Sequence, residues 1–333
     1  MRRRTLLSAS LGLGSLAGWA YVGGLHGATS VLSSFSDSGA AFGTTVTIQV
    51  LHHDPVVAQS AIADALAQVR QVDALMSLHQ ESSQVYQLNL HGQLDAPDPH
   101  LVQVLRYAQQ LASQTAGAFD ITVQPLWLAF SEAHERGELP TPELQTKAKA
   151  LVDWRRLSVN EHHIRLATPG MGITLNGLAQ GYAVDLAMAA LRARGITHAL
   201  LDTGEFGSLG SKTAGQAWVL GIKNPRQTDA LAARVPLDGR QLATSGDYEM
   251  FFTPDFVHHH IFDSATGDSP TALASTTVLA PTGLMADGLS TAFMVMGADK
   301  TLALAAQLPQ VDALLIYKNG TRQTTPGFPA LAA

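Results

Sequence analysis

The chain has 333 residues, of which 46% are apolar and only 14% carry a charge. This composition fits a globular protein with a large core and excludes a disordered polyelectrolyte or a coiled coil. Lys and Arg number 21 against 27 Asp and Glu, so the net charge of −6 provides no field to gather nucleic acid, and we expect no nucleic-acid partner. The absence of cysteine rules out disulfides, thiolate metal sites and a cysteine-linked lipid anchor.

Residues 1–28 have the features of an export signal. Three arginines precede an apolar run rich in small residues, and the segment holds no acid. The letters RRTLL at residues 3–7 follow the twin-arginine pattern, which predicts a periplasmic protein exported by that route. An uncleaved anchor is the alternative, although the apolar stretch 6–22 hardly reaches the roughly 20 residues of a spanning helix. Residues 29–41, rich in Ser, Gly and Ala, are predicted to be a linker.

The folded domain is expected to run from Phe42 to residue 333. Residues 44–50, TTVTIQV, alternate like a strand. Residues 98–117 predict a helix that is capped by Asp98 and closed by Gly117. Residues 55–78 predict another helix, whose apolar side chains fall largely on one face: Val56, Ile62, Leu66, Val69, Val72 and Leu75.

A third helix is predicted over residues 175–195, LNGLAQGYAVDLAMAALRARG, and it opens on unusually bare backbone. In one interpretation Asn176 caps the first turn and Gly195 ends the last. In the other, exposed N–H groups at the helix start receive an anion such as the phosphates of a nucleotide. The residues alone leave both interpretations open.

Short strands dominate the later half of the chain. They are predicted at residues 197–202, 217–222, 239–245, 256–262 and 275–281, with a hairpin turn at Asn319-Gly320. One more helix is predicted over residues 283–297. Helices cluster early and strands late, so the predicted class is α+β, a single unit with mixed or antiparallel sheets and packed helices.

Asp287 and Thr291 are four residues apart and therefore share a face near the start of that last helix. A carboxylate and a hydroxyl so placed form a hard oxygen pair suited to Mg²⁺, which takes substrate phosphate oxygens and waters as further ligands. The alternative is structural: Asp287 suits the positive end of the helix, and Thr291 bonds back to a carbonyl.

Five segments occur in the order and form found in one family: TAGAFDITVQPLW, LNGLAQGYAVD, ATSGDYEMFF, HIFDSATG and TVLAPTGLMADGLSTA. With them the chain from Phe42 onward resembles the FAD:protein FMN transferases of the ApbE family. The resemblance implies a single α+β unit and Mg²⁺ held by Asp287, Thr291 and the carbonyl of Ala179. It further implies transfer of the FMN half of FAD to a Ser or Thr hydroxyl of another protein, with release of AMP.

The same resemblance implies a set of nucleotide-binding residues. The turn at the Gly-rich helix start would cradle the FAD pyrophosphate, and two other segments and one turn would lie beside the nucleotide. The implied residues are Asn176, Gly177, Gln180 and Gly181 in the cradle, and Asp120, Thr122, Glu205, Thr244, Ser245 and Asp247 beside it.

His260 is the implied general base, with Asp263 orienting it, because the family carries His-x-x-Asp-x-x-Thr-Gly at this segment. An imidazole that titrates near neutrality suits proton removal. The alternatives are a partly exposed strand in which His258 and His260 share a face and His259 points the other way, or a zinc site. The zinc site would combine these histidines with some of His52, His53, His162 and His163.

The chain departs from the family pattern at several positions. Gln180 stands where a Lys is usual, and Glu205 and Phe206 stand where Gly and Asn are common. Phe42 replaces a frequent Met, and Leu78 and His79 stand where an aromatic residue usually follows the Ser. In other respects the chain is similar to the exported NosX-type members associated with nitrous-oxide reduction, which implies a membrane-bound electron-transfer protein as acceptor. Hydrolysis of FAD to FMN and AMP, or non-catalytic flavin binding and delivery in the periplasm, are the alternative functions.

Overall fold

A computed structural model describes residues 32–213, 215–329 and 331 of the chain. The predicted export signal, residues 1–28, lies outside the described residues. The helices are α1 (Pro55–Met76), α2 (Gln84–His91), α3 (Pro99–Gln114), α4 (Gln124–Glu135), α5 (Pro142–Lys149), α6 (Ala179–Ala193) and α7 (Gly283–Ala305). The strands are β1 (Ser33–Ala41), β2 (Thr44–His52), β3 (Gln93–Asp95), β4 (Leu157–Val159), β5 (His163–Leu166), β6 (Ala199–Asp202), β7 (Phe206–Leu209), β8 (Val219–Asn224), β9 (Gln227–Pro236), β10 (Gln241–Gly246), β11 (Leu273–Ala280), β12 (Asp312–Tyr317) and β13 (Arg322–Thr324).

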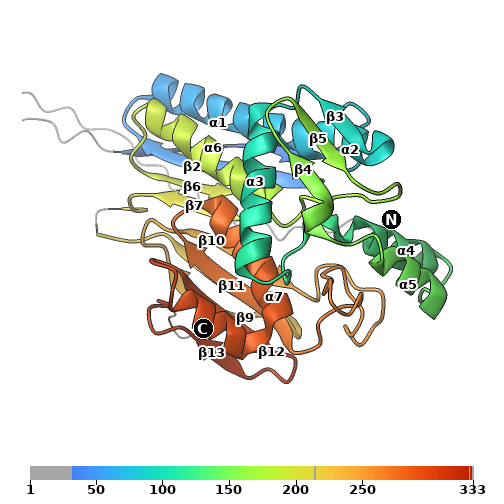
Figure 1. Ribbon diagram of the computed structural model, residues 1–333. Coiled ribbons are helices and arrows are strands. Elements are labelled where there is room, and N and C mark those ends of the chain that lie inside the picture. The colour runs from blue at the N-terminus through green and yellow to red at the C-terminus, as the bar shows by residue number, and fades with distance from the viewer. Residues whose placement is uncertain (1–31, 214, 330, 332–333) are drawn as a thin grey trace, which may run out of the picture. The chain divides into compact units, whose positions relative to one another are not determined.

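An eight-stranded sheet organises the described residues. Its order is β1-β2-β6-β7-β10-β11-β12-β13, and every neighbouring pair is antiparallel. α1 packs over β1 and β2, α6 over β7, and α7 over β10 and β11, while α1 contacts α6 and α6 contacts α7 (Figure 1). The antiparallel sheet with its helical layer confirms the predicted α+β class.

The central strands of this sheet are buried on both faces, and their alternate residues divide between the two faces. In β12, Ala313 and Leu315 belong to the core under the helices, whereas Leu314 and Ile316 face a second cluster built with Trp218 and other residues of the β8–β9 hairpin. A strand with both faces covered is expected to be apolar throughout. β11 is buried along its whole length but departs from that expectation in its middle, where Ser275, Thr276 and Thr277 are polar.

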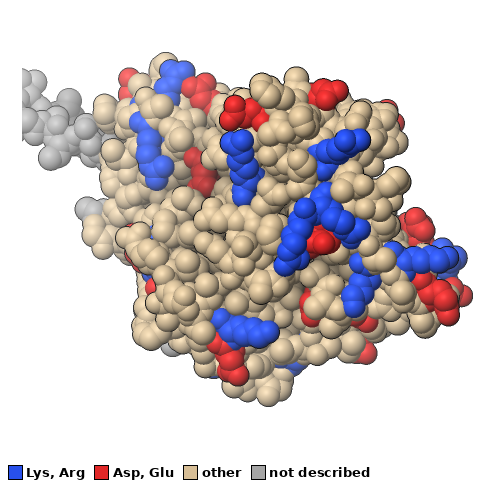
Figure 2. Space-filling view, viewed as in Figure 1, with Lys and Arg blue, Asp and Glu red and all other residues tan. Residues whose placement is uncertain are grey.

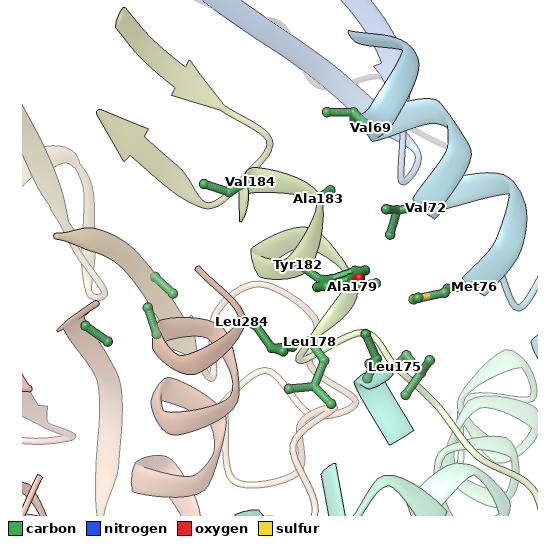
Figure 3. Packing of buried hydrophobic residues seen from close by; sticks show 14 of the residues in the cluster. Val69, Val72, Met76, Leu175, Leu178, Ala179, Tyr182, Ala183, Val184 and Leu284 are labelled. Carbon is green, nitrogen blue, oxygen red and sulfur yellow. The ribbon is translucent and has the colours of Figure 1, made fainter. Parts of the chain in front are cut away.

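The main core lies where α1, α6 and α7 meet. Val72 and Met76 of α1 point toward Ala179 and Tyr182 of α6, and Leu284 of α7 lies near Leu178 (Figure 3). The small residues of α6 allow the neighbouring helices to approach it closely. The start of α6 and the start of α7 are thereby fixed beside each other.

The predicted helices are found, with local differences. Asp98 caps α3 by accepting the N–H of His100, and Gly117, at φ +84°, follows its end. In α1, however, Val56 is 69% exposed, so its predicted place on the apolar face is wrong. Alanines supply much of the buried face instead, where they leave room for α6: Ala58, Ala61 and Ala65.

The predicted linker over residues 29–41 is wrong for residues 33–41, which form β1. This strand pairs with β2 from Ser33 opposite His52 to Ala41 opposite Thr44. Phe42 and Gly43 both have positive φ, 53° and 70°, as a two-residue hairpin turn requires. β1 is an edge strand whose side chains are mostly exposed, so its backbone pairing needs no apolar alternation and left no sequence signal.

Charged side chains are spread over the face shown in Figure 2, where Lys and Arg are interspersed with Asp and Glu and no large region of one sign is seen. Within residues 32–213, 215–329 and 331, no helix combines the length and the apolar character needed to cross a membrane.

Candidate active site

The start of α6 is built differently from the capping prediction. α6 begins at Ala179, and the residue at its N-cap is Leu178, which makes no side-chain capping bond. Asn176 is exposed and lies two residues before that cap, so its predicted capping role is wrong. The N–H of Gly181 instead donates to Oδ2 of Asp287 on α7, at 2.9 Å.

A second carboxylate makes the reciprocal contact. Asp185 of α6 accepts the N–H groups of Gly283, at 2.6 Å, and Leu284, at 2.9 Å, at the start of α7. Each helix therefore presents a carboxylate to the positive N-terminal end of the other. Asp185 was not among the predicted site residues; its only sequence signal is that it is the one acid of the α6 segment.

Gly181 permits this contact because the helices touch there through their backbones. A Cβ on Gly181 would lie 2.2 Å from the carbonyl oxygen of Gly283 and 2.6 Å from Cβ of Asp287. On Gly177, a Cβ would lie 2.7 Å from Oγ1 of Thr291. The glycine-rich turn that the sequence singled out thus packs directly against Asp287 and Thr291.

We expect Gly181→Ala to lower the free energy of unfolding by about 3 kcal/mol or more, because neither backbone can move aside without separating α6 from α7. Gly177→Ala should cost about 1 kcal/mol, since it meets a side-chain hydroxyl that can rotate. Urea unfolding of the two variants measures the difference. Equal losses in both variants would contradict the proposed backbone contact.

Asp287 is 3% exposed, and burial raises the pKa of its carboxyl to about 7, an effect that the Gly181 hydrogen bond opposes and the charge of Asp185 reinforces. In the described part of the chain its Oδ1 accepts no hydrogen bond. Thr291, one turn further along α7, has its Oγ1 3.1 Å from Oγ of Ser245 on β10. A buried carboxylate with a spare oxygen, beside a hydroxyl, fits a hard cation.

The predicted metal ligands therefore fit Mg²⁺ by their chemistry. Asp287 and Thr291 lie against the turn that leads into Ala179, the first residue of α6. Within the described ranges, neither here nor elsewhere do three or more His, Asp or Glu side chains form a group that could hold a metal ion. The imidazoles proposed for zinc are bound otherwise: His258 to Asp268, His259 to the Pro270 carbonyl and His52 to the Asp54 backbone.

Glu205, in the turn between β6 and β7, lies at the same site. It is 9% exposed, and its Oε2 accepts the N–H of Thr244 at 3.1 Å. Burial, and then the negative charge of Asp287, raise the pKa of its carboxyl well above the ordinary value. Gln180 donates its amide to the Thr203 carbonyl in the same turn. Glu205 is thus a buried carboxylate on which the charge of Asp287 acts, and its place beside a nucleotide stays a prediction.

Asp120 and Thr122 were predicted to contact the flavin nucleotide, but their polar atoms hold the local chain together. Asp120 accepts the backbone and hydroxyl of Thr122 through Oδ1, and the N–H of Trp154 through Oδ2. The Thr122 hydroxyl also accepts the N–H of Asp153. These bonds tie the start of α4 to the segment before β4.

Asp247 was also predicted to lie beside the nucleotide, and in the structure its carboxylate is paired with a basic side chain. It is fully buried and forms a bidentate pair with Arg226, at 2.8 and 2.7 Å. Lys318 lies 3.3 Å from the same carboxylate. The side chain of Asp247 is therefore engaged in holding β10, β12 and the β8–β9 hairpin together.

Arg226→Met should lower the free energy of unfolding by about 3 kcal/mol, because the buried carboxylate of Asp247 loses its main partner. Arg155→Met is the matched control: Arg155 pairs with Asp153 but is 66% exposed, so its loss should change stability by less than about 0.5 kcal/mol. Urea unfolding at neutral pH compares the two. A loss below 1 kcal/mol in Arg226→Met would show that the ion pair is not structural.

His260 lies in a segment that is not the predicted strand. Residues 256–262 form no strand, and their only bridge joins His259 to Phe251. Backbone bonds tie this segment to the loop before it, such as the one that the N–H of His260 donates to the carbonyl of Met250. Nδ1 of His260 is 2.9 Å from the carbonyl oxygen of Met250. That carbonyl can only accept, so Nδ1 carries the proton and Nε2 has its lone pair available.

Burial lowers the pKa of His260, which keeps its imidazole neutral, as a general base must be. Asp263 does not orient it, so that prediction is wrong. Its Oδ1 instead accepts the N–H of Ala265 at 2.8 Å, the local Asx-turn bond that an Asp two residues before its donor commonly makes. The carbonyl of Met250 has the orienting role.

The predicted residues thus fall into two groups. Around the α6–α7 junction the structure gathers Gly177, Ala179, Gln180, Gly181, Glu205, Thr244, Ser245, Asp287 and Thr291. His260 makes its side-chain hydrogen bond to Met250 and none to this group among the described residues. Asp120, Thr122 and Asp247 have their side chains committed to structural bonds. A separate cavity of about 620 Å³, lined in part by Tyr107 and Leu284, opens beside the junction.

A family model described as the ApbE family matches residues 42–315. Curated FAD:protein FMN transferases are similar over most of the chain. The Treponema pallidum protein is 28% identical over 328 residues, covering 92% of this chain and 90% of that protein. The Haemophilus influenzae protein is 32% identical over 287 residues, covering 80% and 82% respectively.

Solved structures agree with these sequence matches. The flavin transferase ApbE from Vibrio cholerae gives a TM-score of 0.79 at 26% identity and covers 90% of this chain and 100% of that one. The ApbE protein from Thermotoga maritima gives a TM-score of 0.79 at 26% identity, covering 88% and 97%. The resemblance seen in the five sequence segments is confirmed. The chain therefore belongs to the ApbE family and, with it, to the transferases.

Proposed function

We propose that this chain is an exported, Mg²⁺-dependent FAD:protein FMN transferase. It moves the FMN half of FAD onto a Ser or Thr hydroxyl of another protein and releases AMP. Family membership supports the transfer. The observation that carries the Mg²⁺ dependence is the buried Asp287 carboxylate, which is held by the Gly181 N–H and lies one helical turn from Thr291.

Asp287, Thr291 and the carbonyl of Ala179 would hold the cation. Bound there, Mg²⁺ supplies neutralisation of the charge on the diphosphate and on the departing AMP oxygen. Gly177 packs against Thr291, so the backbone N–H groups of this turn would lie beside a cation held there and could donate to phosphate oxygens. These residues would align the diphosphate, which is the main requirement for transfer at phosphorus.

His260 would take the proton from the acceptor hydroxyl. Because Nδ1–H donates to Met250, Nε2 is the atom that receives this proton. The acceptor oxygen then bonds to the FMN phosphorus, the bond from that phosphorus to the bridging oxygen breaks, and AMP leaves with the bridging oxygen. The protonated imidazole can return its proton to the leaving phosphate or to water.

The location and the acceptor form part of the proposal. The twin-arginine-like signal over residues 1–28 supports export to the periplasm, and a periplasmic transferase requires an acceptor that is itself exported or membrane-bound. Similarity to the NosX-type branch favours a membrane-bound electron-transfer protein. Reading the mature N-terminus from fractionated cells tests the export route.

One assay separates transfer from the two alternative functions. Mature protein is mixed with FAD, Mg²⁺ and a candidate acceptor domain, and flavin fluorescence in a denaturing gel is read together with AMP release. A fluorescent acceptor band supports transfer. AMP without that band identifies FAD hydrolysis, and bound flavin without either product identifies a carrier.

A further inference from the structure

Glu205 is a buried carboxylate with an unused oxygen. Its side chain is 9% exposed, and its one hydrogen bond in the described part of the chain is the Thr244 N–H donated to Oε2. No Lys, Arg or His in that part forms an ion pair with it. One backbone N–H is weak compensation for a carboxylate removed from water.

Glu205 also lies close to a second buried carboxylate. The charge of Asp287 acts directly on it, and Asp287 is 3% exposed with one oxygen that accepts no hydrogen bond from a described residue. Glu205 is joined to the same site by a second route. Its partner Thr244 precedes Ser245, whose Oγ is 3.1 Å from Oγ1 of Thr291. Glu205 is thus linked through β10 to Thr291, and Asp287 lies one turn before Thr291 on α7.

The neighbouring side chain that would be expected to neutralise this pair does not do so. Gln180 stands where a Lys is usual, and its neutral amide is bound to the Thr203 carbonyl. Two like charges in a site shielded from water repel strongly unless a cation or a proton intervenes. A hard divalent cation takes carboxylate oxygens as its preferred protein ligands, and its affinity rises with the number of charged ligands.

We propose that Glu205 is a further carboxylate ligand of the divalent cation held by Asp287 and Thr291, so that this chain binds the cation before any flavin nucleotide arrives. The inference rests on the Mg²⁺ site of the proposed function. Glu205 would add a negative charge to the cation site, and the cation it helps to hold would neutralise both the carboxylates and the diphosphate. The order of binding follows: cation first, and then the dinucleotide onto the occupied site.

Direct titration of Mn²⁺ tests this inference without turnover. Mn²⁺ has the same preference for oxygen ligands as Mg²⁺, and its free fraction is read from its electron paramagnetic resonance signal in nucleotide-free mature protein, with Mg²⁺ as competitor. We expect Glu205→Gln to weaken Mn²⁺ binding at least about 10-fold, because a charged ligand is lost. Glu249→Gln is the matched control, since this exposed carboxylate acts on Glu205 electrostatically, and its loss should weaken binding less than about threefold.

Three outcomes would overturn the inference. They are unchanged Mn²⁺ affinity in Glu205→Gln, an equal loss in Glu249→Gln, and no Mn²⁺ binding by the wild type until FAD is added. None of these three results contradicts the proposed function. That function is contradicted by a different result, acceptor labelling by Asp287→Asn. Circular dichroism of each variant excludes unfolding, and Glu205→Asp should recover part of the affinity that Glu205→Gln loses.

Discussion

Asp287→Asn is expected to abolish FMN transfer and at the same time to make the metal-free protein more stable. The loss of transfer follows from the loss of the charged cation ligand, whose charge neutralisation supplies several kcal/mol, or roughly 10³-fold or more in rate. The gain in stability follows because Asn keeps an oxygen for the Gly181 N–H but carries no buried charge.

The stability effect has a definite dependence on pH. The pKa of Asp287 is about 7 in the folded protein, whereas an Asp in an unfolded chain titrates near 3.9. Between these values the folded state binds the proton more tightly, so the stability of the metal-free wild type falls as pH rises through this window. Above the folded pKa the wild type has lost all of this stability. Asp287→Asn should then be more stable than the metal-free wild type by on the order of 2–4 kcal/mol.

Urea unfolding in EDTA at pH 5 and pH 8 measures this effect, and acceptor labelling measures the catalytic effect. The gain in Asp287→Asn should be larger at pH 8 than at pH 5. Added Mg²⁺ should stabilise the wild type and not the variant, because the cation binds only the folded site. A variant that labels the acceptor normally, or that is less stable than the wild type at pH 8 in EDTA, would remove Asp287 from the metal site.

Features governed by near neighbours in the chain could be predicted from the sequence. The spacing of Asp287 and Thr291 fixes a shared helix face, and Asp98 lies directly before the apolar repeat that it caps. The Asn319-Gly320 turn does join β12 to β13. In each case the controlling interaction spans a few residues, so composition and spacing carry the information.

Features governed by distant contacts could not be predicted in this way. The N–H of Gly181 finds its acceptor 106 residues away, and the sequence offered a local cap or a ligand phosphate instead. β1 exists because β2 provides a partner, although its own residues are mostly small or polar. For Asp120 and Asp247 the family resemblance predicted a place beside the nucleotide, but only the structure shows their carboxylates bound to Trp154, Thr122 and Arg226.

His260→Ala is expected to lower kcat for FMN transfer by about 10²–10⁴-fold, the range that a positioned general base contributes. Binding of FAD should change little, since no other role in the site depends on the imidazole. Burial lowers the pKa of His260, so the wild-type rate should stay high as pH falls and decline only below the ordinary imidazole value of about 6.5. Initial rates of acceptor labelling from pH 5 to pH 8 test both statements.

Asp263→Asn separates the two accounts of how His260 is oriented. If the Met250 carbonyl fixes the imidazole, the variant keeps its Asx-turn oxygen for the Ala265 N–H, and kcat and the pH profile should remain within about twofold of wild type. If Asp263 were the orienting carboxylate, kcat should fall by an amount comparable to His260→Ala, and the acid limb should move to lower pH. A fall of that size would mean that the loop rearranges to bring Asp263 onto the ring when the acceptor binds.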